Sequence, residues 1–136
     1  MFLFGAALGV GIGLVPVLAG PPTPEAALPS GQEIASHDWF LEEQLDGQVW
    51  LVMRYLAPRI ARDGGDLGYD DVIADFDALC HGPGRAAAAD IVDRGGAVDQ
   101  VVLILMDRAV PRGEADPTAT TFIAAYTVGP EECAFQ

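Results

Sequence analysis

The sequence contains no lysine and no asparagine, and its 136 residues carry seven basic side chains against 20 acidic ones. The formal net charge at neutral pH is therefore −13. Binding to nucleic acid or to an anionic membrane surface needs clustered lysine and arginine, so this composition argues against both kinds of partner. A cationic partner or a metal ion stays open, but solubility is the simplest use of so acidic a surface.

Residues that serve as catalytic nucleophiles and bases are also scarce. The chain has two serines, Ser30 and Ser36, and two histidines, His37 and His81. Neither serine lies in a GxSxG or SxxK motif, so no hydrolase triad is expected. The two cysteines and two histidines lack the spacing of a structural zinc site. The balance favours a protein that is not an enzyme, and no catalytic residue or cofactor is predicted.

No charged side chain occurs before Glu25, and residues 1–19 form an apolar segment. Val17-Leu18-Ala19 resembles the small-x-small pattern of a signal-peptidase site, and the Pro-rich residues 20–30 read as an exposed linker. The segment therefore predicts a cleaved signal peptide, with the periplasm or another exported location as the compartment.

An uncleaved membrane anchor is the alternative for the same segment. No basic residue precedes the apolar run, and small residues recur every four positions at Gly5, Gly9 and Gly13. Pro16 argues against an anchor because it leaves only a short uninterrupted stretch for a span of about 20 residues. The membrane would be contacted only through this segment.

The chain has two cysteines, Cys80 and Cys133. In an exported chain such a pair is expected to form a disulfide. The bridge would close a loop of about fifty residues and stabilise the fold by roughly 4 kcal/mol on the chain-entropy model. The spacing excludes a CxxC redox motif.

Two neighbouring segments predict a β-hairpin. Residues 33–45 and 48–57 are rich in β-branched and aromatic side chains, and Asp46-Gly47 between them suits a type I′ turn. In this hairpin Trp39 and Trp50 are expected to face each other across the strands. If they are exposed, they are candidates for contact with a protein partner.

A helix is predicted next, with Asp70 or Asp71 as its N-cap and Gly82-Pro83-Gly84 as its end. Its apolar residues recur at offsets of three and four, at Val72, Ile73, Phe76, Leu79 and Cys80. A second short helix is expected over residues 85–94.

Residues 100–106 are continuously apolar, which predicts a central strand covered on both faces. Residues 118–128 are compatible with a helix or a strand and are assigned as a strand. The order of elements predicts an α+β fold: a four-stranded, mainly antiparallel sheet (β-β-α-α-β-β) with helices covering one face, in a single domain over residues 31–136.

Three charged residues stand at the ends of the apolar strands, Arg54, Asp107 and Arg108. An arginine in this position usually pairs with a carboxylate, and Asp107 or an aspartate of the helix is the expected partner of Arg54. The structural interpretation is a satisfied ion pair, and the functional one is a spot that binds an anion or a partner. Asp63, Asp66 and Asp70 form a weak calcium candidate, and a solvated loop is the simpler interpretation.

Several stretches carry a family resemblance. They are Tyr55 to Pro58, Tyr69 to Asp75 with Leu79-Cys80, Leu105 to Pro111, and the late Cys133. Over residues 28–135 the chain resembles a family of small exported alphaproteobacterial proteins classed only as a domain of unknown function. The resemblance implies no activity, ligand or catalytic residue.

Two functional hypotheses follow from the sequence. The first is a small acidic periplasmic domain that binds or supports an unidentified protein partner without catalysis. The alternative is a small-ligand-binding protein or enzyme with a site around Arg54, Asp107 and Arg108. If the apolar segment is retained, the chain would be a membrane-anchored accessory subunit of a larger complex.

Overall fold

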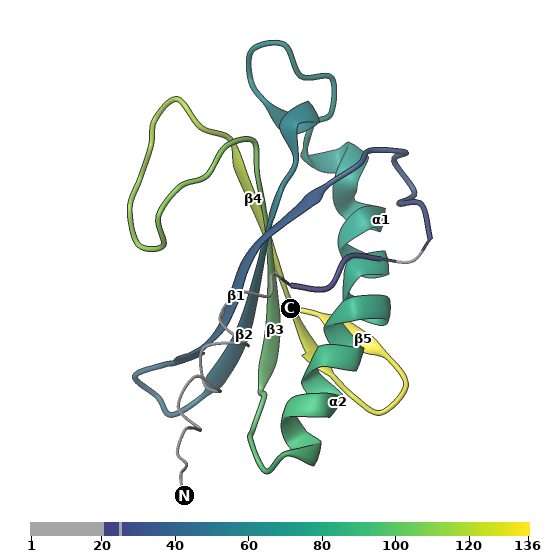
Figure 1. The fold of residues 1–136 in the computed structure, drawn as a ribbon, viewed down its shortest axis with the longest axis vertical. Coiled ribbons are helices and arrows are strands. Elements are labelled where there is room, and N and C mark those ends of the chain that lie inside the picture. Colours follow the sequence, from purple (N-terminus) through teal and green to yellow (C-terminus); the bar gives the residue numbers. More distant parts are fainter. Residues whose placement is uncertain (1–20, 25) are drawn as a thin grey trace, which may run out of the picture.

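The computed structural model describes residues 21–24 and 26–136, so the predicted signal peptide or anchor at residues 1–19 lies outside the described residues. Within this part the chain forms five strands in one sheet: β1 (Ala35–Glu43), β2 (Val49–Leu56), β3 (Gln100–Met106), β4 (Thr121–Val128) and β5 (Cys133–Phe135). Figure 1 shows the sheet with a long helix along one face. The α+β class is confirmed.

The sheet is mixed, which corrects the prediction of four mainly antiparallel strands. Its order is β1-β2-β3-β4-β5, and β2 pairs with β3 in parallel while the other pairs are antiparallel. Because the helical segment between β2 and β3 carries the chain back along the sheet, the two strands run in the same direction. The fifth strand was not predicted, since a strand of three residues has no readable alternation.

The predicted hairpin of β1 and β2 is present, but its turn is one residue longer than expected. The turn is closed by the Gln44 N–H, which donates to the Gln48 carbonyl at 2.7 Å, and by the Gly47 N–H, which donates to the Gln44 carbonyl at 3.0 Å. Gly47 alone in the turn has a positive φ, of 91°, whereas a type I′ turn needs a positive φ at two residues. The three-residue turn Leu45 to Gly47 therefore replaces the two-residue one.

The two predicted helices form one continuous helical rod. It consists of α1 (Tyr69–Leu79), the π-helical turn η3 (Cys80–Gly84) and α2 (Arg85–Asp93). The Arg85 N–H donates to the Cys80 carbonyl five residues earlier, and this widened turn accommodates Pro83 where the sequence predicted an end. At Gly84 an added Cβ would lie 3.3 Å from Cγ1 of Val101, so the glycine lets the helix approach β3.

The start of the helix also differs from the prediction. Gly68 is the N-cap, and the Asp71 carboxylate accepts a hydrogen bond from its N–H at 2.8 Å. Asp71 thus caps the helix from inside its first turn, where a negative charge is favoured, and neither Asp70 nor Asp71 is the cap residue itself.

Apolar side chains fill both faces of the sheet. The larger cluster lies between the helix and the sheet; it includes Leu51, Met53, Tyr55, Phe76, Leu79, Leu103 and Tyr126. A second cluster on the helix-free face joins the strand residues Val52, Val102, Ile104 and Met106 to Val110 and Ala119 of the following connection. All of residues 101–106 are buried, which confirms that β3 is covered on both sides.

Part of the predicted linker packs on the domain. Leu28 is buried in the helix-side cluster, and the Tyr55 hydroxyl donates to the Pro22 carbonyl at 2.6 Å. The linker is therefore anchored to the fold at Pro22 and Leu28, while Pro22, Thr23, Ala26, Ala27 and Pro29 are exposed.

Candidate functional site

Arg54 finds its carboxylate on the neighbouring strand. Its Nε and Nη2 each donate to a carboxylate oxygen of Asp38 at 2.6 Å, and its Nη1 donates to the Val110 carbonyl at 2.6 Å. The guanidinium also lies 5.9 Å from the ring centre of Phe40. The hydrogen bonds from Arg54 lower the pKa of Asp38. The predicted partner, Asp107 or a helix aspartate, was wrong because residue 54 stands opposite residue 38 in the ladder.

Asp107 and Arg108 form a separate pair at the base of the β3–β4 connection. The Asp107 carboxylate accepts from the Thr120 N–H at 2.6 Å and from Arg108 at 2.9 Å. Arg108, whose side chain is half exposed, also donates to the Thr118 hydroxyl. No hydrogen bond or ion pair among the described residues joins this pair to Arg54. The predicted three-residue spot is thus divided into two ion pairs.

Trp39 and Trp50 lie on opposite faces of the sheet and do not face each other. Trp39 stands opposite Met53 and packs against the helix-side cluster, while Trp50 stands opposite Glu42 and packs on the helix-free face. The extra residue in the hairpin turn shifts the register by one position, and such a shift turns a side chain to the other face. Both rings are half buried.

The three calcium candidates do not converge. Asp66 accepts two hydrogen bonds from Arg59, at 2.8 and 2.7 Å, and Asp70 lies in the first turn of α1. Asp63 is exposed. Within residues 21–24 and 26–136, no three side chains of histidine, cysteine, aspartate or glutamate are grouped so that they could hold a metal ion.

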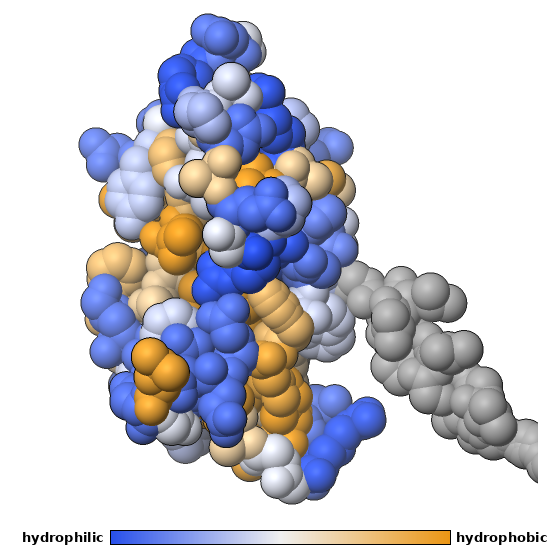
Figure 2. All heavy atoms as spheres, turned by 90° about the vertical axis from the view of Figure 1, so that its left-hand side faces the viewer, coloured by the Kyte–Doolittle hydropathy of each residue, from blue (hydrophilic) through white to orange (hydrophobic). Residues whose placement is uncertain are grey.

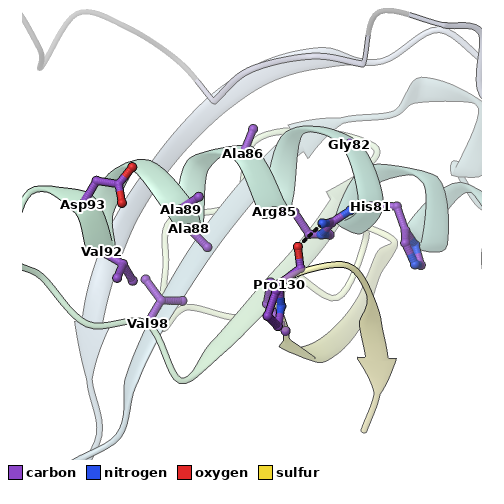
Figure 3. Close-up of a pocket in the computed structure, with 12 residues that line it drawn as sticks. His81, Gly82, Arg85, Ala86, Ala88, Ala89, Val92, Asp93, Val98 and Pro130 are labelled. Atoms are coloured by element: carbon purple, nitrogen blue, oxygen red, sulfur yellow. Dashed lines mark hydrogen bonds between the residues drawn. The ribbon is translucent and has the colours of Figure 1, made fainter.

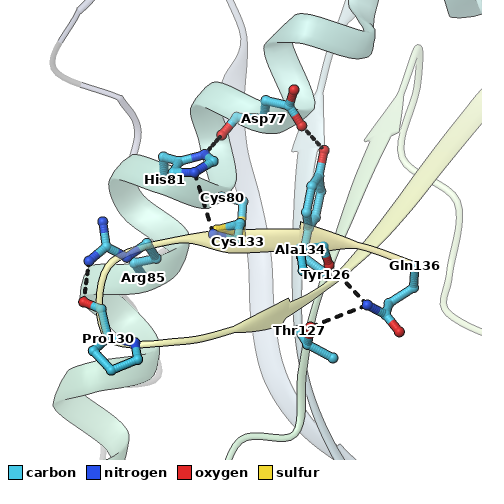
Figure 4. The surroundings of a disulfide bond; sticks show 10 residues. All are labelled: Asp77, Cys80, His81, Arg85, Tyr126, Thr127, Pro130, Cys133, Ala134 and Gln136. Carbon is cyan, nitrogen blue, oxygen red and sulfur yellow. Dashed lines mark hydrogen bonds between the residues drawn. A yellow bond between two sulfur atoms is a disulfide. The ribbon is translucent and has the colours of Figure 1, made fainter.

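The predicted disulfide is present and joins the helix to β5. Cys80 and Cys133 are bonded, with their Cα atoms 6.2 Å apart (Figure 4). The Cys133 N–H donates to Nε2 of His81, and the Tyr126 hydroxyl donates to Asp77 at 2.7 Å. Burial and this contact with Asp77 raise the pKa of Tyr126. The bonded Cys80 cannot act as a nucleophile beside His81.

A buried carboxylate that sequence reasoning missed lies on the inner side of α1. Asp75 is fully buried and accepts hydrogen bonds from the Ser30 N–H at 2.8 Å, the Ser30 hydroxyl at 2.5 Å and the Gln32 side chain at 2.8 Å. Its spacing of three from Val72 and four from Leu79 is the signal that places it on the apolar stripe. Asp75 fixes the segment before β1 to the helix.

A groove of about 680 Å³ lies between α2 and the β4–β5 turn (Figure 3). His81 and Arg85 stand near one end and Asp93 near the other. Arg85 donates from Nη2 to the Pro130 carbonyl, and its buried Nε has no hydrogen-bond partner among the described residues. The remaining lining is largely small and apolar and includes Ala86, Ala88, Ala89, Val92, Val98 and Val128.

A second hollow, of about 480 Å³, lies beneath the connection between β3 and β4, residues 107–120, which we call the roof loop. Strands β3 and β4 supply an apolar wall that contains Ile104, Met106 and Ile123. Arg54, Arg62 and Arg112 also line it. Seen from the helix-free side, the molecule presents apolar residues among hydrophilic ones (Figure 2).

The roof loop is tied to the fold by arginines. Arg62 donates from Nη1 to the Pro117 carbonyl at 2.9 Å and from Nη2 to the Ala119 carbonyl at 3.3 Å. Arg112 in the loop donates to both oxygens of Glu42, at 3.0 and 2.9 Å. These hydrogen bonds lower the pKa of Glu42 to about 2.

Five of the seven arginines pair with a carboxylate: Arg54, Arg59, Arg94, Arg108 and Arg112. Arg62 and Arg85 have no carboxylate partner within the described part of the chain; their partners are backbone carbonyls. Arg85 lines the groove beside α2, and Arg62 lines the hollow beneath the roof loop. Pairing depends on tertiary contacts, so the sequence could not distinguish these two arginines from the others.

Comparison with known proteins places the chain in a family. A model described as a family of unknown function (DUF6497) matches residues 14–136, so the chain belongs to this family. No curated protein and no solved structure matches it. The expected membership in a family of unknown function is confirmed, and it assigns no activity.

Proposed function

We propose that this family member is an exported, non-enzymatic domain that binds a protein partner in the groove beside α2. The observation that carries the proposal is the groove itself, with an alanine-rich floor and the uncompensated Arg85 near one end. Small side chains let a partner backbone come close, and an arginine without a carboxylate favours an acidic group on that partner.

The state of the polar side chains supports binding over catalysis. Both cysteines are in the disulfide, and the Ser30 hydroxyl donates to the buried Asp75. Ser36 donates its hydroxyl to the Pro21 carbonyl at 2.5 Å. A serine nucleophile needs a neighbouring base that accepts its proton, and neither serine has a histidine in that position.

The proposed export rests on the apolar segment and on the disulfide, because disulfides persist mainly in oxidising compartments. In the described part of the chain, no helix is long and apolar enough to cross a membrane. Intact-mass measurement of protein from the native host tests the compartment. We expect removal of the apolar segment together with the loss of two hydrogens; a full-length, reduced chain would contradict export.

A pair of matched variants tests the groove. Ala89 lines it, whereas Ala74 is exposed on α1 and is not among the lining residues. We expect a periplasmic protein to be retained by immobilised wild type and by Ala74→Glu, and to be lost with Ala89→Glu. Both variants add one negative charge to an exposed helical position, so charge alone cannot explain a difference. Equal retention by both variants would refute the groove as the binding surface.

A further inference from the structure

We propose that the hollow beneath the roof loop binds a small monoanionic molecule with an apolar body, such as a carboxylate or sulfonate. This site is separate from the groove beside α2. Its volume of about 480 Å³ lies within the range of small-molecule pockets, which is about 300–1,000 Å³. It combines an apolar wall with a cation, the combination that an amphiphilic anion requires.

Arg62 is the cation that would meet the anionic group. A guanidinium has five N–H donors, and the two hydrogen bonds of Arg62 engage one donor on each terminal nitrogen. Those contacts, to the Pro117 and Ala119 carbonyls, fix the guanidinium against the roof loop before any ligand binds. The remaining N–H groups are available for a carboxylate or sulfonate, which arginine binds with charge-assisted hydrogen bonds.

Three of the other charged side chains that line the hollow already have partners. Arg54 and Arg112 pair with Asp38 and Glu42. Asp116 accepts from the N–H and hydroxyl of Thr118, at 2.9 and 2.7 Å, so its carboxylate is engaged within the loop. Glu114 also lines the hollow, but it is exposed to solvent, which screens its charge.

Only Arg62 among the lining arginines lacks a carboxylate partner within the described residues. One uncompensated cation matches one negative charge, and a polyanion would be repelled by a chain of net charge −13.

The apolar wall of the hollow would contact the apolar body of the ligand. Ile104 and Met106 are buried in the sheet, whereas Ile123 is 50% exposed and belongs to the same lining. An exposed isoleucine in the same lining as a fixed cation gives a surface that an aliphatic or aromatic body would cover. The class of ligand is therefore an amphiphile of a few to about sixteen carbon atoms, in keeping with the pocket volume.

The fluorescent probe anilinonaphthalene sulfonate tests the site, because it joins an aromatic body to one negative charge. We expect the oxidised protein to bind one probe molecule and Arg62→Gln to weaken binding by about tenfold or more. Arg59→Gln is the matched control, since Arg59 is a nearby exposed arginine that pairs with Asp66 and is not part of the lining. It should bind the probe as wild type does.

Two further measurements keep the test specific. Octanoate should displace the probe, and octanol at the same concentration should displace it much less. Ile123→Ser, at a half-exposed position, should weaken probe binding while the melting temperature stays close to that of wild type. Equal probe affinity in wild type and Arg62→Gln, or equal displacement by octanoate and octanol, would overturn the proposal. So would the absence of probe binding to wild type.

Discussion

Arg54 and Asp38 stand opposite each other in the β1–β2 ladder and share two hydrogen bonds of 2.6 Å. The two partners differ in exposure: 6% of the Arg54 side chain is accessible, against 44% of Asp38. The same guanidinium holds the roof loop through the Val110 carbonyl. The pair therefore connects the edge of the sheet to the loop that covers its helix-free face.

This asymmetry predicts unequal effects of removing either partner. Asp38→Ala leaves a buried guanidinium without its carboxylate and should lower the free energy of unfolding by about 2 kcal/mol. Arg54→Met should cost less, because Asp38 can return to water and methionine fills the space. Urea denaturation of both variants measures the difference. A larger loss for Arg54→Met would show that the hydrogen bond to Val110 outweighs the ion pair.

The disulfide should be the largest single contribution to stability. Its cysteines are 53 residues apart, and closing a loop of that length is worth about 4 kcal/mol on the chain-entropy model. The double variant Cys80→Ala/Cys133→Ala is therefore expected to unfold at a much lower denaturant concentration than oxidised wild type. Reduced wild type serves as the control and should match the variant. A loss below about 1 kcal/mol would mean that other contacts hold β5 in place.

The tether between Arg112 and Glu42 predicts a dependence of stability on pH. The folded pKa of Glu42 is about 2, below its ordinary value of 4.5. The stabilisation by this ion pair is therefore fully present above pH 4.5 and is lost as the pH falls through about 2. Since the pair is partly exposed, its contribution should be about 0.5–1 kcal/mol and should shrink in high salt.

Carboxyl NMR titration of wild type and Arg112→Gln checks this prediction. In the variant, the pKa of Glu42 should rise towards 4.5, and the difference in stability between the two proteins should shrink as the pH falls from 4.5 and vanish below about pH 2. An unchanged pKa of Glu42 would show that the roof loop is not tied to β1 in solution.

Asp75 should be intolerant of a change that conserves its shape. Asp75→Asn replaces one acceptor oxygen by an NH₂ group that faces the donors of Ser30 and Gln32. We expect a loss of about 2–3 kcal/mol, because a buried donor is left facing other donors. Hydrogen exchange should become faster in residues 28–34 before the sheet is affected. Equal exchange throughout the chain in both proteins would contradict the anchoring role of Asp75.

Local sequence patterns were sufficient to predict several elements of the fold. The continuous apolar run of residues 100–106 identified the central strand, and the spacing of Val72, Phe76 and Leu79 identified α1. Two cysteines in a chain with an apolar first segment identified the disulfide, because each has only one possible intramolecular partner. In each case the prediction needed only the residues of one segment or the number of cysteines in the chain.

Long-range relationships were not available from the sequence. The parallel pairing of β2 and β3 depends on how the helix crosses the sheet, and a helical connection leaves either direction possible. One extra residue in the turn at Gly47 separated Trp39 from Trp50. The partner of Arg54 and the isolation of Arg62 depend on which strands become neighbours, so the candidate site could be predicted only in part.

The bond between Cys80 and Cys133 also closes a covalent ring that contains α2, β3, β4 and the whole roof loop. A protease that cuts the ring once, for example after the exposed Arg112, releases no fragment, because both pieces stay joined through sulfur. Such nicked protein runs as an intact chain on a non-reducing gel and separates only when it is reduced. A sample whose roof loop has been cleaved can therefore be mistaken for intact protein.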